Sequence, residues 1–167
     1  SDLDCRGCAA KIPQNVLNDS LRNAKLDLIA DYPEDANEIY RSDKEIILQS
    51  IDGFPSLISD PWLNGRITAL HACSDLWACG ASISSSQVLV SIPKVDYSIQ
   101  NYLFSQSLDG IRSVISELGG QILGGHTFES RHVVKKPYSL GIDIALTVQG
   151  ILKVDKKICT KHGMKSG

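Results

Sequence analysis

Residues 48–81 read "LQSIDGFPSLISDPWLNGRITALHACSDLWACGA", and they join a strand to a helix. The strand is predicted over residues 44–51, which are rich in β-branched side chains and short enough for a largely buried element. The helix follows because Asp60 can serve as its N-cap, Pro61 suits its first position and Gly80 stands just past its end. These two elements form the first strand–helix pair of the predicted fold.

Similar patterns extend on both sides of this pair. Residues 31–43 read as an acidic loop, whereas the flanking apolar residues recur at helical spacing or alternate along the chain. Helices are predicted over residues 13–30 and 97–118, and strands over residues 86–93, 120–125 and 139–152. This order predicts an α+β fold, in which a mixed β-sheet has its helices packed on one face.

The composition suits a single domain, residues 1–167, with its own core. Hydrophobic residues make up 43% of the chain, the net charge is −2, and no apolar run could span a bilayer. Nucleic acid and membranes are therefore not expected partners. The five cysteines are an odd number without a secretory leader, which predicts free thiols and a cytoplasmic location.

A polar stripe runs along the predicted helix that begins at Pro61. Asn64, Thr68, His71 and Asp75 are spaced four, three and four residues apart, which places them on one side of a helix. Taken alone, such a stripe is usually a solvated face. A carboxylate in the last turn meets the negative end of the helix dipole, however, and a bound cation would reverse that unfavourable interaction.

Three aspartates can converge at one edge of the sheet: Asp35 in the acidic loop, Asp52 at the end of the first strand and Asp75 near the end of the helix. Mg²⁺ prefers hard oxygen ligands and takes one or two carboxylates together with substrate phosphates. A convergence of these three carboxylates would suit a nucleotide site. Singly, each aspartate also suits an ordinary cap or turn.

The segment "GGQILGGHTF", residues 119–128, carries four glycines. A strand that runs into Gly124, Gly125, His126 and Thr127 would expose bare backbone N–H groups and a hydroxyl, a combination that binds phosphate oxygens. The alternative is a tight strand exit that needs positive φ angles. The spacing matches neither the common P-loop nor the dinucleotide-binding pattern.

The segment "CRGCAAK", residues 5–11, holds a C-x-x-C pair. No second pair stands at ligand spacing, so a structural zinc site is not expected. Cys8 lies three residues before Lys11 and close to Arg6, and nearby cations lower the pKa of a thiol. The pair could be a reactive cysteine with a phosphate-binding lysine, or two incidental thiols in a mobile N-terminus.

Taken together, "CRGCAAKI", the stretch at 48–81 and "LGGHTFES" resemble selenophosphate synthetase, also called selenide, water dikinase. More broadly, they resemble the N-terminal half of the aminoimidazole ribonucleotide synthetase superfamily. The resemblance runs from Cys5 to about Gly150, and it implies ATP and Mg²⁺ as cofactors. It also implies conversion of ATP, selenide and water to selenophosphate, AMP and phosphate.

The resemblance implies a role for each matching residue. Asp35, Asp52 and Asp75 would hold Mg²⁺, and Asp52 would also contact ATP. Lys11 would reach the transferred phosphate, and Cys8 would be the reactive cysteine that handles selenium. The residues that would line the phosphates are Gly124, Gly125, His126 and Thr127.

The resemblance further implies a homodimer, in which two sheets join into a barrel-like core with the nucleotide near the interface. The family's two domains total about twice this length, so the chain is expected to be the ATP-binding half, with the C-terminal half absent and little activity alone. Residues 1–12 are expected to form a mobile lid. The motif spellings look most like versions fused behind an NAD(P)H-dependent flavoprotein, whereas residues 34–38, "EDANE", depart from the family's D-D-A-A.

Two other functions stay open. The chain could belong to another ATP-dependent member of the superfamily, one that activates an amide or carbonyl oxygen. Such an enzyme should not need a cysteine at position 8. The chain could also be a dimerising or regulatory domain without catalysis.

Overall fold

The computed structural model of the protein describes residues 11–31, 34–56, 58–130, 141–155 and 158. Its elements in chain order are α1 (Gln14–Asn23), α2 (Asp27–Asp31), β1 (Ala36–Arg41), β2 (Glu45–Pro55), α3 (Pro61–Ala78), β3 (Ser82–Pro93), α4 (Tyr97–Ile115), β4 (Gln121–Ser130) and β5 (Asp143–Lys153). The strands form one sheet in the order β1-β2-β5-β3-β4. The pair β3–β4 is parallel and the other neighbouring pairs are antiparallel, which confirms the predicted mixed sheet.

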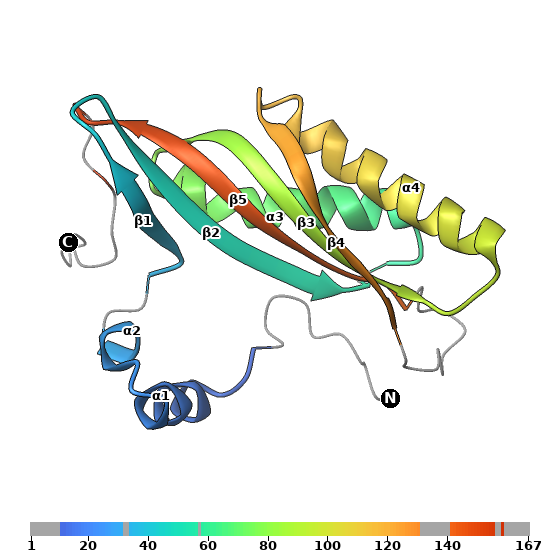
Figure 1. Cartoon of the computed structure of the whole chain (residues 1–167), viewed down its shortest axis with the longest axis horizontal. Helices are drawn as coiled ribbons and strands as arrows, with labels where there is room; N and C mark the ends of the chain where they lie inside the picture. The colour runs from blue at the N-terminus through green and yellow to red at the C-terminus, as the bar shows by residue number, and fades with distance from the viewer. Residues whose placement is uncertain (1–10, 32–33, 57, 131–140, 156–157, 159–167) are drawn as a thin grey trace.

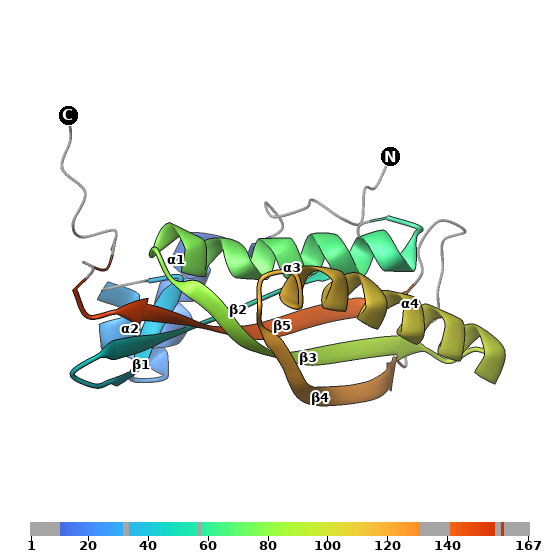
Figure 2. The ribbon, with the colours of Figure 1, turned by 90° about the horizontal axis from the view of Figure 1, so that it is seen from above.

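The helices α3 and α4 lie side by side across one face of the sheet (Figures 1 and 2). Within the described ranges, the opposite face carries no helix, and this confirms the prediction that helices cover one face. The helices α1 and α2 lie apart from that layer, below β1 in Figure 1. The sheet is open in the single chain and is not closed into a barrel, so the barrel-like dimer stays a prediction.

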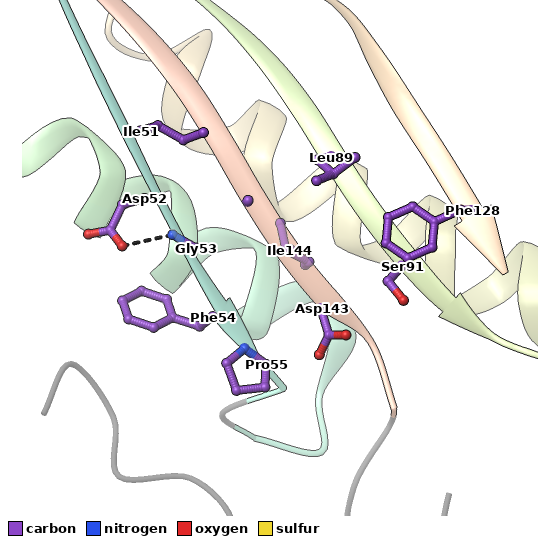
Figure 3. Close-up of a pocket in the computed structure, with 11 residues that line it drawn as sticks. Ile51, Asp52, Gly53, Phe54, Pro55, Leu89, Ser91, Phe128, Asp143 and Ile144 are labelled. Carbon is purple, nitrogen blue, oxygen red and sulfur yellow. Dashed lines mark hydrogen bonds between the residues drawn. The ribbon is translucent and has the colours of Figure 1, made fainter. Parts of the chain in front are cut away.

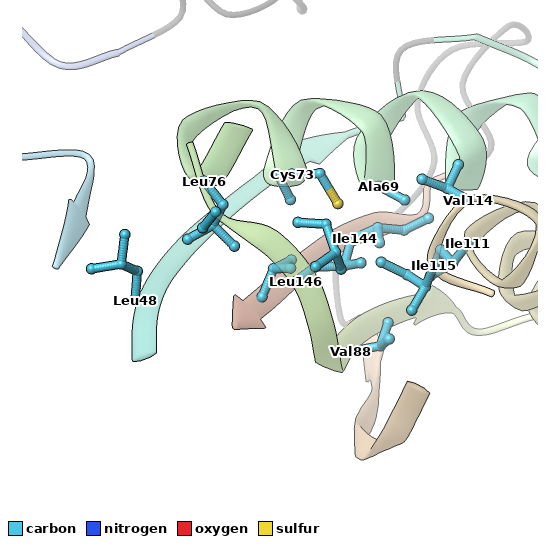
Figure 4. Close-up of a cluster of buried hydrophobic side chains, with 14 of the residues drawn as sticks. Leu48, Ala69, Cys73, Leu76, Val88, Ile111, Val114, Ile115, Ile144 and Leu146 are labelled. Carbon is cyan, nitrogen blue, oxygen red and sulfur yellow. The ribbon is translucent and has the colours of Figure 1, made fainter. Parts of the chain in front are cut away.

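The core lies between the sheet and the two covering helices (Figure 4). Alternate residues of β5 point into it, and Ile144, Leu146 and Val148 are at most 1% exposed. The helix side contributes buried residues of α3 and α4, among them Leu76 and Ile115. Burying a side chain of this size contributes roughly 1.5–3 kcal/mol, so this layer fixes the position of α3 over the sheet.

The two covering helices touch almost backbone to backbone. A Cβ atom on Gly65 would lie 2.2 Å from the carbonyl oxygen of Ser107, and one on Gly110 would lie 2.0 Å from that of Trp62. The contact is reinforced at its margin, where Trp62 Nε1 donates a hydrogen bond to Asp109 Oδ2 at 2.8 Å. No residue larger than glycine fits either position at this helix spacing.

Two predictions near the N-terminus are wrong. The helix predicted over residues 13–30 is divided into α1 and α2, because Lys25 adopts a left-handed φ of 61° that ends the first helix. The loop predicted over residues 31–43 contains β1, an edge strand that is exposed along most of its length. A strand with little buried surface has no apolar alternation, and β1 owes its conformation to pairing with β2.

Several predicted strands are longer in the structure. The first strand continues beyond residue 51 to Pro55, so Asp52 lies within β2 and not at its end. The short strand predicted over residues 120–125 continues as β4 to Ser130, and it pairs with β3 along its length apart from one register irregularity at Leu123. The strand therefore does not end at the glycines, so the alternative of a tight strand exit is wrong there, although Gly124 does adopt the positive φ that this alternative required. Residues 139–140 of the last predicted strand lie outside the described residues, and β5 begins at Asp143.

Candidate functional site

The three predicted aspartates and Lys11 line one pocket of about 450 Å³. It lies where β1 and β2 meet the C-terminal part of α3. The structure therefore brings together side chains from four places in the chain, although their roles as ligands stay predictions. We call this hollow the acid pocket, and its remaining lining residues are Glu34, Asn37, Ile39, Gln49, Ser50 and Ile51.

Asp52 faces the helix layer. Even-numbered residues of β2 such as Ser50 and Phe54 are buried, and Asp52 continues that side of the strand. Its Oδ1 atom accepts a hydrogen bond from the Gly53 N–H at 2.7 Å (Figure 3). Its Oδ2 atom lies 2.7 Å from Nδ1 of His71, which reaches down from α3. The carboxylate thus has one protein contact at each oxygen.

Asp75 occupies the wall of the acid pocket formed by α3. The hydroxyl of the buried Ser50 donates a hydrogen bond to its Oδ2 atom at 2.9 Å. No basic residue stands in the last turn of α3 to offset the carboxylate there. A cation in the pocket would provide that compensation.

The polar stripe of α3 runs from the core to the acid pocket. Asn64 and Thr68 are fully buried, and the hydroxyl of Thr68 donates to the backbone carbonyl of Asn64 at 2.7 Å. The solvated-face interpretation is therefore wrong for these two residues. The exposed side of α3 is instead partly apolar, and it carries Leu63, Ile67, Leu70 and Trp77.

Two residues of this region were not predicted as site residues. His71 was noted only as part of the stripe, and its contact with Asp52 depends on the pairing of α3 with β2, which spacing alone does not give. Glu34 lines the acid pocket, and its Oε1 atom is buried without a hydrogen-bond donor among the described residues. Its position beside Asp35 in the departing "EDANE" segment was the available signal.

The donor set of the acid pocket fits Mg²⁺. Carboxylate and amide oxygens are the hard ligands this ion takes, usually with several retained waters. Within the described part of the chain, no three His, Cys, Asp or Glu side chains are close enough to enclose a metal ion directly. Like-charged carboxylates repel one another, so the aspartates are expected to lie further apart without a cation than around one. The pocket suits an ion that is held by few carboxylates together with phosphate oxygens.

The predicted phosphate-binding glycines lie elsewhere on the sheet. Gly124, Gly125, His126 and Thr127 belong to β4, and two strands, β5 and β3, separate it from β2. Three strand spacings amount to roughly 14 Å. One chain therefore does not bring these residues into the acid pocket; they line two other hollows, of about 330 and 480 Å³.

Local backbone geometry already requires glycine at two of these positions. Gly124 has a φ of 137°, beside a register irregularity in the β3–β4 pairing. A Cβ atom on Gly125 would lie 1.9 Å from the carbonyl oxygen of Val88. His126 and Thr127 are exposed. The segment is thus part of an exposed edge strand whose glycines leave the backbone accessible to solvent or to a partner.

The remaining predicted catalytic residue, Cys8, lies outside the described residues. Lys11 is the first described residue and is exposed. Cys73 belongs to α3 and faces the core, where burial raises the pKa of its thiol to about 11. That thiol is therefore protonated at neutral pH and is no candidate for a reactive thiolate.

Comparison with known proteins identifies the fold and the family. Residues 33–152 match the family described as AIR synthase related protein, N-terminal domain. The chain belongs to this family. The match confirms the broader resemblance predicted from the motifs and covers the AIR synthase related domain from before β1 into β5.

The AIR synthase related domain has curated relatives named selenide, water dikinase. That of Aliarcobacter butzleri is 33% identical over 133 residues, covering 77% of this chain and 38% of the relative. That of Pelobacter propionicus is 30% identical over 171 residues, covering 96% and 44%. The chain thus spans less than half the length of these relatives.

A solved structure, AaThiL complexed with AMPPCP and TMP, shares the fold. It superimposes with a TM-score of 0.62 at 13% identity, covering 86% of this chain and 45% of that one. Among the described residues, no helix combines the length and apolarity required to cross a lipid bilayer.

Proposed function

We propose that this AIR synthase related domain is the ATP-binding half of a selenide, water dikinase, which converts ATP, selenide and water to selenophosphate, AMP and phosphate. The observation that carries the proposal is the acid pocket, where Asp35, Asp52, Asp75 and Lys11 line one cavity. The names of the curated relatives support the choice of reaction.

Four residues of the acid pocket have a part in this proposal. Asp52 on β2 and Asp75 on α3 present carboxylates to the pocket from facing elements. Asp35, which directly precedes β1, presents a third carboxylate. When bound there, Mg²⁺ supplies positive charge against the phosphate oxygens of ATP. Lys11 adds a flexible cation at the pocket's rim that can follow the transferred phosphate. Phosphoryl transfer consists mainly of positioning and charge neutralisation, which these side chains supply. Cys8 is proposed to handle selenium.

The glycine segment of β4 is proposed to complete the acid pocket of a second copy. The open face of the sheet carries Ile51, Leu89 and Phe128, which are 70%, 41% and 49% exposed. They line a hollow of about 480 Å³ that shares Ile51 and Asp52 with the acid pocket (Figure 3). Packing two such faces together would bury these side chains, form the barrel-like core and bring a bare edge strand near the partner's aspartates.

Calorimetric titration with ATP and Mg²⁺ tests the binding step on this chain. The wild-type chain should bind, and Asp52→Asn and Asp75→Asn should each weaken binding by at least about tenfold because a charged metal ligand is lost. Asp96→Asn is the matched control, since Asp96 is an exposed aspartate at the start of α4 that makes no capping hydrogen bond. Equal binding by all four proteins would contradict the proposed site.

The reaction itself is tested on a full-length protein that contains this domain. Given ATP, Mg²⁺ and selenide, it should release AMP and a phosphate bonded to selenium, which phosphorus NMR detects. Formation of ADP alone, without dependence on selenide, would support the superfamily member that activates an amide or carbonyl oxygen. Absence of nucleotide binding would support the regulatory domain.

A further inference from the structure

His71 lies at the border of the acid pocket, in contact with Asp52, and the proposed function gives it no part. It stands on α3 four residues before Asp75, on the same side of the helix. Its side chain is 30% exposed and that of Asp52 is 22% exposed, so the pair is partly shielded from water. Partial shielding strengthens an electrostatic contact relative to one on an open surface.

The contact between these residues restrains the Asp52 carboxylate. Nδ1 of His71 lies 2.7 Å from Oδ2 of Asp52, while the Gly53 N–H donates to Oδ1 at 2.7 Å. An ionised carboxylate offers about four lone-pair positions on its two oxygens. The Gly53 N–H occupies one of these positions on Oδ1, and Nδ1 of His71 lies close beside Oδ2, so lone pairs on both oxygens stay available to a cation or its water.

The imidazole is itself held in place from β2. Its ring meets that of Phe54 edge to face, with the centroids 4.7 Å apart and the planes at 90°. Phe54 is 7% exposed, so its ring is buried and has little room to move. The backbone at Asp52 is fixed too, since it pairs with Leu146 in the middle of the β2–β5 ladder. The side-chain rotation of Asp52 is the freedom that remains, and His71 limits it.

We propose that His71 is a positioning residue that holds the carboxylate of Asp52 in the orientation that receives the nucleotide-bound cation. The inference rests on the proposed function, because it assigns His71 to the same pocket. Protein groups that orient a metal-ligating side chain typically contribute 10–100-fold to metal affinity. A merely structural His71 would instead serve to fill the space beside Phe54.

The test measures Mn²⁺ binding by the full chain with electron paramagnetic resonance, in the presence of AMPPCP. His71→Leu keeps bulk against Phe54 and removes the nitrogen, so it should weaken Mn²⁺ binding by about tenfold or more. His71→Asn places an amide nitrogen near the position of Nδ1, so it should restore affinity to within about threefold of wild type. AMPPCP binding without metal ion should be equal in all three proteins.

A matched control is Ser74→Ala, which alters an exposed residue of α3 whose hydroxyl donates to the backbone carbonyl of His71. It should bind Mn²⁺ as the wild type does. If His71→Leu does not fold, His71→Met replaces it as the variant without the nitrogen. Wild-type Mn²⁺ affinity in a folded Leu or Met variant would overturn the inference and leave the proposed function standing. A wild-type chain that binds no Mn²⁺ would overturn both.

Discussion

The acid pocket and the glycine segment of β4 were predicted as two parts of one phosphate site, but the structure treats them differently. The acid pocket is assembled within one chain, because β1, β2 and α3 are neighbours. The glycine segment lies on the opposite edge of the sheet, with β5 and β3 in between. Motifs that cooperate in a site need not be neighbours in one chain, and the strand order decides which of them are.

The largest effect is expected from Gly125→Ala, which asks whether the glycines serve the fold or only a ligand. The added Cβ would lie 1.9 Å from the carbonyl oxygen of Val88, so β4 must move off β3. We expect the free energy of unfolding to fall by about 3 kcal/mol or more, measured by urea denaturation. Leu123→Ala is the control on the same strand. Leu123 is 61% exposed, so its loss should cost less than about 1 kcal/mol. Unchanged stability in Gly125→Ala would mean that the two strands are not so closely paired.

Mixed dimers separate a shared site from a site within one chain. Asp52→Asn damages the acid pocket and Thr127→Val damages the glycine segment, and the two variants are co-expressed with different tags and purified as a heterodimer. If each acid pocket uses the partner's β4, one of the two sites contains both changes and the other contains neither. Calorimetry with ATP and Mg²⁺ should then find about half of the wild-type binding sites. If each chain uses its own β4, both sites are damaged and no full-affinity site appears.

The smallest expected effect is on the pH dependence of stability, and it comes from Cys73 on α3, the helix that carries Asp75. Burial on the core side of α3 raises the pKa of Cys73 from 9.0 to about 11, so the unfolded chain releases this proton at a lower pH than the folded chain, and alkaline pH therefore favours unfolding. The contribution of the protonated thiol to stability is complete below about pH 9 and is lost as the pH rises towards 11; at pH 10, one unit above the unfolded value, the loss is about 1 kcal/mol. Urea denaturation of wild type and Cys73→Ala between pH 8 and 10 should show a steeper alkaline decline in the wild type. Parallel declines would contradict the burial of this thiol.

The part of the fold that sequence predicted best is the part with buried, patterned side chains. Asp60 and Pro61 mark the start of α3, and Asp60 Oδ1 accepts a hydrogen bond from the Leu63 N–H at 2.9 Å as expected of an N-cap. The alternation along β5 was equally clear. The edge strands were missed or shortened, because β1 and β4 bury few side chains and take their form from a neighbour.

The candidate site was likewise predicted best where its residues stand in patterned, buried elements. The convergence of Asp52 and Asp75 could be predicted because each stands in an element with a clear pattern, whereas Asp35 stands beside β1, which has none, and its role came from the family resemblance. The contact of His71 with Asp52 could not be predicted, because it depends on how α3 packs across β2. The distance from the glycines to the aspartates could not be predicted either, because β5 follows every other strand in sequence yet inserts between β2 and β3.

The close contact at Gly65 and Gly110 extends its influence to residues that neither glycine touches. Two helices in such contact cannot slide or tilt independently, so α4 acts as a brace for α3. His71 and Asp75 belong to α3, so the distance of their side chains from β2 depends on where α4 holds this helix. A bulky replacement at position 110 would thus displace residues of the acid pocket, although α4 contributes none of the residues that line it.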